Sequence, residues 1–261
     1  MKLGELTPED KQTIIEHLEE LRKSLMVSII AIVAAAVLCF SYNEQILAVI
    51  TLPLRLLDQR LIVTGVTEAF FVKLLLSFYA GFVLAFPIVV WSVWRFFKPA
   101  LYPHERKYVY ILLPVSVFLF TAGVLFSYFG ILPLVLKFFI YIAGANLETM
   151  FKVDQYVSFV TAFTLPFGLV FELPVVVYFL TKFGIVKAEM LAKNRKYALL
   201  IIVVLAAALT PGPDPFSQMM MAGPVYLLYE ISIIVAKMAK PGKGRETGEE
   251  PEIEENGKES E

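Results

Sequence analysis

Apolar residues occupy most of the chain in long runs, which short polar segments interrupt at intervals. A helix that crosses the hydrocarbon core of a bilayer, roughly 30 Å thick, needs about 20 predominantly apolar residues. The runs predict six such helices, at about residues 25–42, 69–97, 108–143, 156–183, 197–210 and 216–236. We therefore expect an all-α membrane protein whose six-span domain covers residues 25–237.

The six predicted spans differ in length. The third is too long for one crossing, so we expect its outer end, after Pro133, to continue beyond the membrane core. The fifth has only about 14 apolar residues before a tight turn at Pro211–Pro215, and the charge-free part of the sixth, before Glu230, is about as long. Pro166 and Pro174 weaken the fourth, because each removes a backbone donor. Short fifth and sixth spans and a distorted fourth predict a cupped bundle rather than a cylinder.

The two ends of the chain differ from the spans. Residues 1–24 combine helix-start signals with charged positions on one side, and Pro8 suits the first helical position. Apolar residues recur on the other side at helical spacing, at Ile14, Leu18, Leu21 and Leu25. We expect an amphipathic helix that lies along the cytoplasmic membrane surface and leads into the first span. Residues 238–261 are acidic and nearly free of apolar side chains, which predicts a disordered cytoplasmic tail.

Composition and charge support this interpretation. Apolar residues make up 58% of the chain, whereas a soluble domain usually has about 45–50%, so lipid must cover the excess. If both termini lie on the same side of the membrane, 18 of the 23 Lys and Arg residues fall on that side and 4 on the other. Cytoplasmic loops are enriched in Lys and Arg. We therefore expect a multi-pass protein of the cell membrane with both termini in the cytoplasm.

The motifs of common enzyme classes are missing from the sequence. It contains no HExxH zinc motif, no GxSxG nucleophile elbow and no GxxxxGK[ST] phosphate-binding loop. The two histidines, His17 and His104, lack metal-ligand partners at useful spacing. We therefore expect that the protein is not an enzyme and has no cofactor or metal site. The energy for any process that it carries out must then come from a partner or from the membrane potential.

One ionisable residue falls deep inside a predicted span. Glu172 lies about ten residues before Lys182, the expected cytoplasmic boundary, which puts it roughly 15 Å deep. A carboxylate at that depth is costly, so it is neutral, paired or facing a wet cavity. Two interpretations stay open: a protonated Glu that bonds a neighbouring helix, or a polar patch where a partner or substrate docks.

Four segments together resemble one known family. They are His17–Arg22 (HLEELR), Phe96–Arg106 (FFKPALYPHER), Phe171–Pro174 (FELP) and Thr210–Gln218 (TPGPDPFSQ). Their order and the span pattern, from about Glu16 to Lys237, resemble the TatC family, the multispanning receptor subunit of the twin-arginine protein translocase. The last segment is one residue longer than the family form, by Gly212.

The resemblance implies a receptor that recognises twin-arginine signal peptides on folded cargo and directs export driven by the proton-motive force. The implied partners are the single-span subunits TatA and TatB, the lipid bilayer and further copies of the chain, with no nucleic acid. Taken alone, Glu20 and Glu105 are ordinary solvated acids. The resemblance assigns both to the twin-arginine recognition site, with Arg22 and Phe96 flanking it.

The resemblance also assigns roles to four further residues. Glu172 becomes the intramembrane acid of the concave face, and Gln218 becomes a polar site where the single-span partners dock. Pro53 and Asp214 become structural residues of the outer loops. Two other functions remain open: a secondary transporter for a small solute with Glu172 as its proton site, although we see no internal repeat, and a purely structural scaffold.

Overall fold

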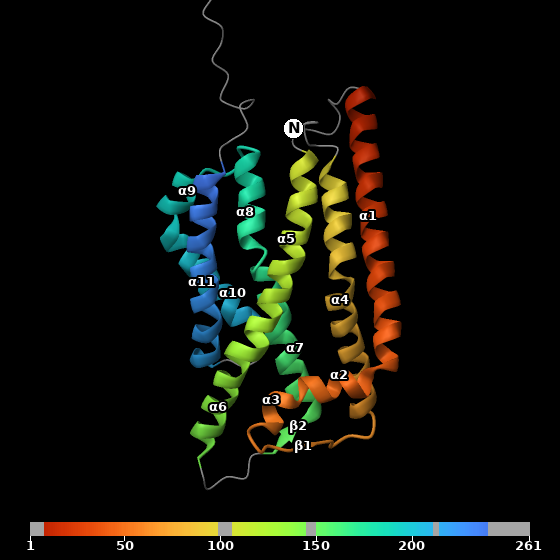
Figure 1. Cartoon of the computed structure of the whole chain (residues 1–261), viewed down its shortest axis with the longest axis vertical. Coiled ribbons are helices and arrows are strands. Elements are labelled where there is room, and N and C mark those ends of the chain that lie inside the picture. Colours follow the sequence, from red (N-terminus) through yellow and green to blue (C-terminus); the bar gives the residue numbers. More distant parts are fainter. Residues whose placement is uncertain (1–7, 99–105, 145–149, 211–213, 240–261) are drawn as a thin grey trace, which may run out of the picture.

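The computed structural model describes residues 8–98, 106–144, 150–210 and 214–239, most of which are helical (Figure 1). In chain order the elements are α1 (Pro8–Ser41), α2 (Asn43–Ile50), α3 (Leu52–Arg55), β1 (Leu61–Ile62), α4 (Glu68–Phe97), α5 (Arg106–Leu125), the π-helix η2 (Phe126–Ile131), α6 (Leu132–Ala143), β2 (Phe151–Lys152), α7 (Val153–Val170), α8 (Leu173–Lys182), α9 (Ala188–Lys193), α10 (Arg195–Leu209) and α11 (Pro215–Met238). The all-α prediction is confirmed apart from two strands of two residues each.

Five segments of the described chain are helical, long and apolar enough to cross a membrane: Leu18–Ser41, Glu68–Phe97, Tyr110–Ala143, Val153–Lys182 and Pro215–Met238. They match the predicted first four spans and the sixth. The predicted fifth, α10, has 15 residues, about 22 Å of helix, and so is shorter than a bilayer core of about 30 Å. The helix at the place of the predicted fifth span is therefore short, as expected. The helix of the sixth, α11, has 24 residues and is not short; only its part before Glu230 is.

The first helix differs from our expectation. We predicted a separate amphipathic helix along the membrane surface, but α1 is one continuous helix of 34 residues that includes both this stretch and the first span. Leu18, Leu21 and Leu25 on its apolar face are all exposed. Residues 8–24 thus continue the axis of the first span, because no proline or glycine interrupts the helix between Pro8 and Ser41.

The third and fourth predicted spans are both interrupted. In the third, α5 passes through the π-helix η2 into α6, which Pro133 opens, and α6 bends away from the axis of α5 (Figure 1). In the fourth, a turn at Phe171 and Glu172 separates α7 from α8. Pro174 explains this break, since it cannot donate the next backbone hydrogen bond. The predicted distortion of the fourth span is confirmed.

Glycines allow two close helix contacts. A Cβ atom added to Gly81 of α4 would lie 2.6 Å from the backbone nitrogen of Ala36 in α1. One added to Gly168 of α7 would lie 2.7 Å from the Phe120 ring of α5, and one on Gly123 of α5 would lie 2.7 Å from the Phe167 carbonyl oxygen. Small residues let membrane helices approach closely and so gain packing energy. These contacts fix α1 on α4 and α5 on α7.

The short elements α2, α3, β1 and β2 lie together at the lower end of the molecule as drawn in Figure 1. There β1 pairs in parallel with β2, and Tyr156 donates a hydrogen bond of 2.8 Å to the Ile50 carbonyl. Glu68 at the start of α4 accepts hydrogen bonds from the Thr64 and Gly65 amides, at 2.6 and 2.8 Å. The loop before α4 and the segment before α7 are thereby joined.

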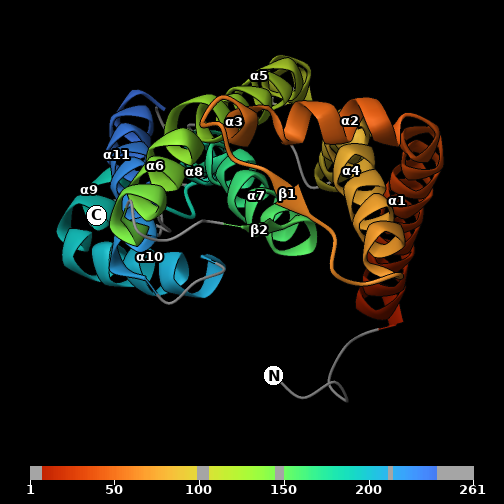
Figure 2. The ribbon, with the colours of Figure 1, turned by 90° about the horizontal axis from the view of Figure 1, so that it is seen from below.

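Seen from this lower end, the helices follow a curve (Figure 2). The helices α1 and α4 stand at one side, α10 and α11 at the other, and α7 lies between them. The arrangement agrees with the cupped bundle that we expected.

Candidate functional site

Three of the four residues predicted to recognise signal peptides lie at the upper end of the molecule. Glu20 and Arg22 are exposed on α1, and Phe96 is half-buried near the end of α4, with its ring 5.2 Å from that of Phe97. The helices α1 and α4 lie side by side, and α5 begins beside the end of α4 (Figure 1). The fourth residue, Glu105, lies outside the described residues, directly before the start of α5.

Glu172 lies in the turn that separates α7 from α8. Its amide donates to the Leu169 carbonyl at 3.1 Å, and its own carbonyl accepts from Val176 at 2.9 Å. The hydroxyl of Ser116 on α5 is within hydrogen-bonding reach of its carboxyl group. The carboxyl oxygen Oε1 is buried and has no hydrogen-bond partner among the described residues. The contact with α5 favours the first of our two interpretations, an acid that bonds a neighbouring helix.

An apolar cavity of about 580 Å³ lies next to Glu172, between α4 and α8. We call it the α4–α8 slot. Its walls are mainly aromatic and aliphatic, with Phe82, Val93 and Phe97 on α4 and Val176 and Phe179 on α8. Apart from Glu172, Ser116 supplies the polar group of the lining. Glu172 thus faces an apolar space among the described residues.

Gln218 and Asp214 organise the start of α11. The Asp214 side chain accepts a hydrogen bond of 2.6 Å from the Ser217 amide, which caps the helix, and Pro215 occupies the first helical turn. The side-chain nitrogen of Gln218 donates to the Val203 carbonyl of α10 at 3.0 Å. Gln218 therefore links α11 to α10 within the chain, and its side-chain oxygen remains to accept a further hydrogen bond.

Pro53 opens the short helix α3 and is buried. Proline suits this place because its fixed backbone angle is already helical and its missing N–H would have no partner there. The position agrees with the structural role that we expected, and nothing about it indicates chemistry.

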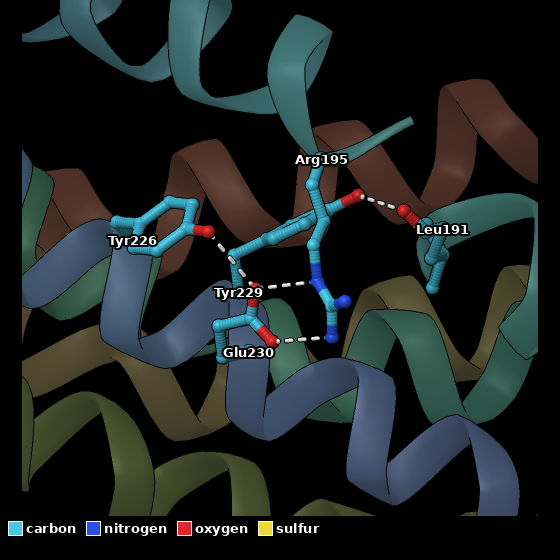
Figure 3. Close-up of polar contacts among 5 residues, drawn as sticks. All are labelled: Leu191, Arg195, Tyr226, Tyr229 and Glu230. Atoms are coloured by element: carbon cyan, nitrogen blue, oxygen red, sulfur yellow. Dashed lines mark hydrogen bonds and ion pairs between the residues drawn. The ribbon is translucent and has the colours of Figure 1, made fainter. Parts of the chain in front are cut away.

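A polar cluster that we did not predict from the sequence lies between α9, α10 and α11 (Figure 3). Arg195 donates two hydrogen bonds to Glu230, from Nε to Oε1 at 2.8 Å and from Nη2 to Oε2 at 2.9 Å. Tyr226 also donates to Glu230, at 3.0 Å, and Tyr229 donates to the Leu191 carbonyl at 2.9 Å. The hydrogen bonds with Glu230 raise the pKa of the Arg195 guanidinium.

A signal for this cluster exists in the sequence. Glu230 is an acid within a predicted span, and such residues usually pair with another group. The sequence does not identify the partner, because Arg195 is 35 residues away. Because Arg195 pairs with the charge of Glu230, α11 can continue as a helix beyond its short charge-free part.

Comparison with known proteins gives a consistent result. Residues 16–224 match the family described as Sec-independent protein translocase protein (TatC). The chain is similar to the protein of that name from Carboxydothermus hydrogenoformans, with 46% identity over 234 residues that cover 89% of this chain and 96% of the relative. It is also similar to TatCy of Bacillus subtilis, with 36% identity over 231 residues, 88% of this chain and 91% of the relative.

A solved structure has the same fold. The chain superimposes on a crystal structure of the twin arginine translocase receptor TatC with a TM-score of 0.79 and 38% sequence identity. The match covers 85% of this chain and 99% of the other.

Proposed function

This chain belongs to the TatC family, and we propose that it is the subunit of the twin-arginine translocase that binds the signal peptides of folded cargo. As a family member it is a core component of that translocase, a multi-pass protein of the cell membrane. The observation that carries the proposal is the family match over residues 16–224, a range that includes all four predicted recognition residues.

The proposed recognition chemistry is a pairing of charges. A twin-arginine ligand carries two planar guanidinium groups that stay charged at any physiological pH. Carboxylates bind such groups through short, charge-assisted hydrogen bonds. We assign this role to Glu20 and Glu105, with Arg22 and Phe96 beside them. The exposure of Glu20 on α1 supports the assignment.

We further propose six spans with both termini in the cytoplasm. The asymmetry of 18 basic residues to 4 supports this orientation, and it requires α10 to cross as a short fifth span. Residues 8–24 would then be a cytoplasmic extension of the first span, and residues 238–261 a cytoplasmic tail.

The proposed partners are TatA and TatB, which would dock at α10 and α11 near Gln218. Several apolar residues of α10 are exposed, among them Leu200, Ile201 and Val204, and a single-span helix could cover them. Assembly of several copies and use of the proton-motive force are part of the same proposal.

The proposal is tested by the binding of a twin-arginine signal peptide to the purified full chain, compared with its twin-lysine counterpart. We expect a clear preference for the arginine peptide, since an ammonium group cannot bind a carboxylate with two parallel hydrogen bonds. Uptake of small solutes by proteoliposomes is the second measurement. Solute uptake without peptide preference would favour the secondary transporter, and neither activity would favour the structural scaffold.

A further inference from the structure

We propose that the α4–α8 slot holds one acyl chain of an anionic phospholipid, whose phosphate lies at the ends of α4 and α8 near Lys98 and Lys182. The lining carries almost no polar groups apart from Glu172 and Ser116, so its occupant must be apolar along nearly its whole length. The choice of the cytoplasmic leaflet rests on the orientation proposed above.

The size of the slot fits a single extended chain. Along α4 its lining runs from Phe82 to Phe97, which is about 22 Å of helix. A helix with its side chains is roughly 10 Å wide, so a helical segment of that length would need roughly 1,700 Å³, about three times the cavity of 580 Å³. An extended hydrocarbon chain of the same length, about 4 Å across at its carbon contacts, needs roughly 280 Å³. The volume therefore favours an acyl chain over a peptide helix.

The slot is accessible to lipid from the side. Val93 on α4 and Val176 on α8 both line it, and each is 47% exposed. Trp94 is buried, and its ring meets that of Phe179 at 4.7 Å, which joins the two walls. An acyl chain can thus enter between Val93 and Val176, as from a bilayer.

The upper end of the slot is basic. Lys98 follows the lining residue Phe97, and Lys182 precedes the lining residue Phe183. The Phe97 and Phe179 rings lie 5.6 Å apart, which brings the ends of α4 and α8 together there. The Lys98 ammonium donates to the Tyr110 hydroxyl at 3.3 Å, which holds it on α5. The cytoplasmic leaflet is rich in anionic lipids, which basic residues attract, so charge complementarity selects an anionic headgroup.

The test is native mass spectrometry of the full chain released from nanodiscs that contain equal amounts of phosphatidylglycerol and phosphatidylcholine with identical acyl chains. We expect one phosphatidylglycerol molecule to stay bound to each chain. Val93→Trp and Val176→Trp fill the slot from opposite walls and should each lower this retention roughly ten-fold, because two buried methylene groups already contribute that much. Lys98→Gln should lower the preference for phosphatidylglycerol roughly five-fold.

Val37→Trp is the matched control, since Val37 is 66% exposed on α1 and lies outside the slot. It should retain lipid as the wild type does. Equal retention by the wild type and both slot variants would overturn the proposal, as would equal binding of the two lipids. A photo-crosslinker at position 93 should label lipid; a crosslink to added signal peptide instead would identify a peptide as the occupant and overturn it. Twin-arginine peptide binding by the same variants is measured separately, so that the loss of lipid alone leaves the proposed function intact.

Discussion

Arg195, the first residue of α10, and Glu230 in α11 are joined by two parallel hydrogen bonds of 2.8 and 2.9 Å. This pair fixes the position of α10 along the axis of α11. Because α10 ends at Leu209 and α11 begins at Pro215, the 15 residues of α10 run beside about the first two thirds of α11. The last turns of α11 face α8 and α9 instead, where Ala236 packs with Val177 and Ala188.

The first prediction concerns this pair. Glu230→Gln and Arg195→Glu should lower the melting temperature of the detergent-solubilised protein, because each leaves one member without its charged partner. Arg195→Lys should lower it less, since an ammonium keeps the charge but not the second hydrogen bond. Exchange of the two charges, Arg195→Glu with Glu230→Arg, should recover part of the loss. No recovery would show that the pair does not act as a unit.

The contact between α1 and α4 should be sensitive to volume. Gly81→Leu places atoms where the Ala36 backbone already lies, and we expect it to destabilise the protein by about 1–3 kcal/mol, as overpacking usually does. Thermal unfolding in detergent measures this. Gly223→Ala is the control, because an added Cβ there meets nothing within 4 Å, and its effect should stay under about 1 kcal/mol. Equal melting temperatures for both variants would contradict the close contact.

Substitutions of Glu172 should separate stability from transport. Glu172→Leu suits the apolar slot and should leave the melting temperature unchanged or higher, since it removes a buried oxygen that lacks a partner. Glu172→Gln keeps hydrogen-bonding capacity toward Ser116 and should preserve more transport than Glu172→Leu does. Glu172→Lys should be worst in both assays, because it buries a positive charge. Higher transport by Glu172→Leu than by Glu172→Gln would show that the side chain of Glu172 contributes only through packing.

Glu105 should carry much of the affinity for a twin-arginine peptide. Hydrogen bonds to charged groups contribute about 1.5–3 kcal/mol, or roughly 10- to 150-fold in affinity. Glu105→Ala and Glu105→Gln should both lose about this much, because the negative charge makes the bond. The sequence places two bases, Arg106 and Lys107, directly after Glu105. Neighbouring bases can compete for a carboxylate, so a loss near the lower limit is expected. Peptide titrations at two salt concentrations measure it, and wild-type affinity for Glu105→Gln would remove this residue from the site.

Gln218 should contribute modestly to partner docking. Interhelical side-chain bonds in membranes are worth about 0.6–2 kcal/mol, so Gln218→Leu should weaken docking of a single-span partner without abolishing it. The same change removes the bond to Val203 of α10. Cysteine crosslinking between this region and the partner is the measurement. Met219→Leu, at the exposed next position, is the control and should crosslink as the wild type does.

Many features of this protein could be predicted from short stretches of its sequence. Runs of apolar residues located the five helical segments that are long enough to cross a membrane, because a helix in lipid needs about 20 of them in sequence. The distortion of the fourth span followed from Pro174, since a proline removes a backbone donor, whereas Pro166 lies inside the continuous helix α7. The short α10 was also readable, because its length depends on a few consecutive residues. The resemblance to one family rested on four such segments.

The tertiary structure decided what depends on residues far apart in the chain. Nothing near Gly81 predicts the Ala36 backbone against it, and nothing near Arg195 predicts Glu230. The amphipathic stretch before Leu25 was compatible with a surface helix or with an extension of the first span, because both conformations use the same helical periodicity. The α4–α8 slot exists only where the break at Glu172 places α8 opposite α4. Such features arise from packing between helices, whose partners the order of residues along one helix does not specify.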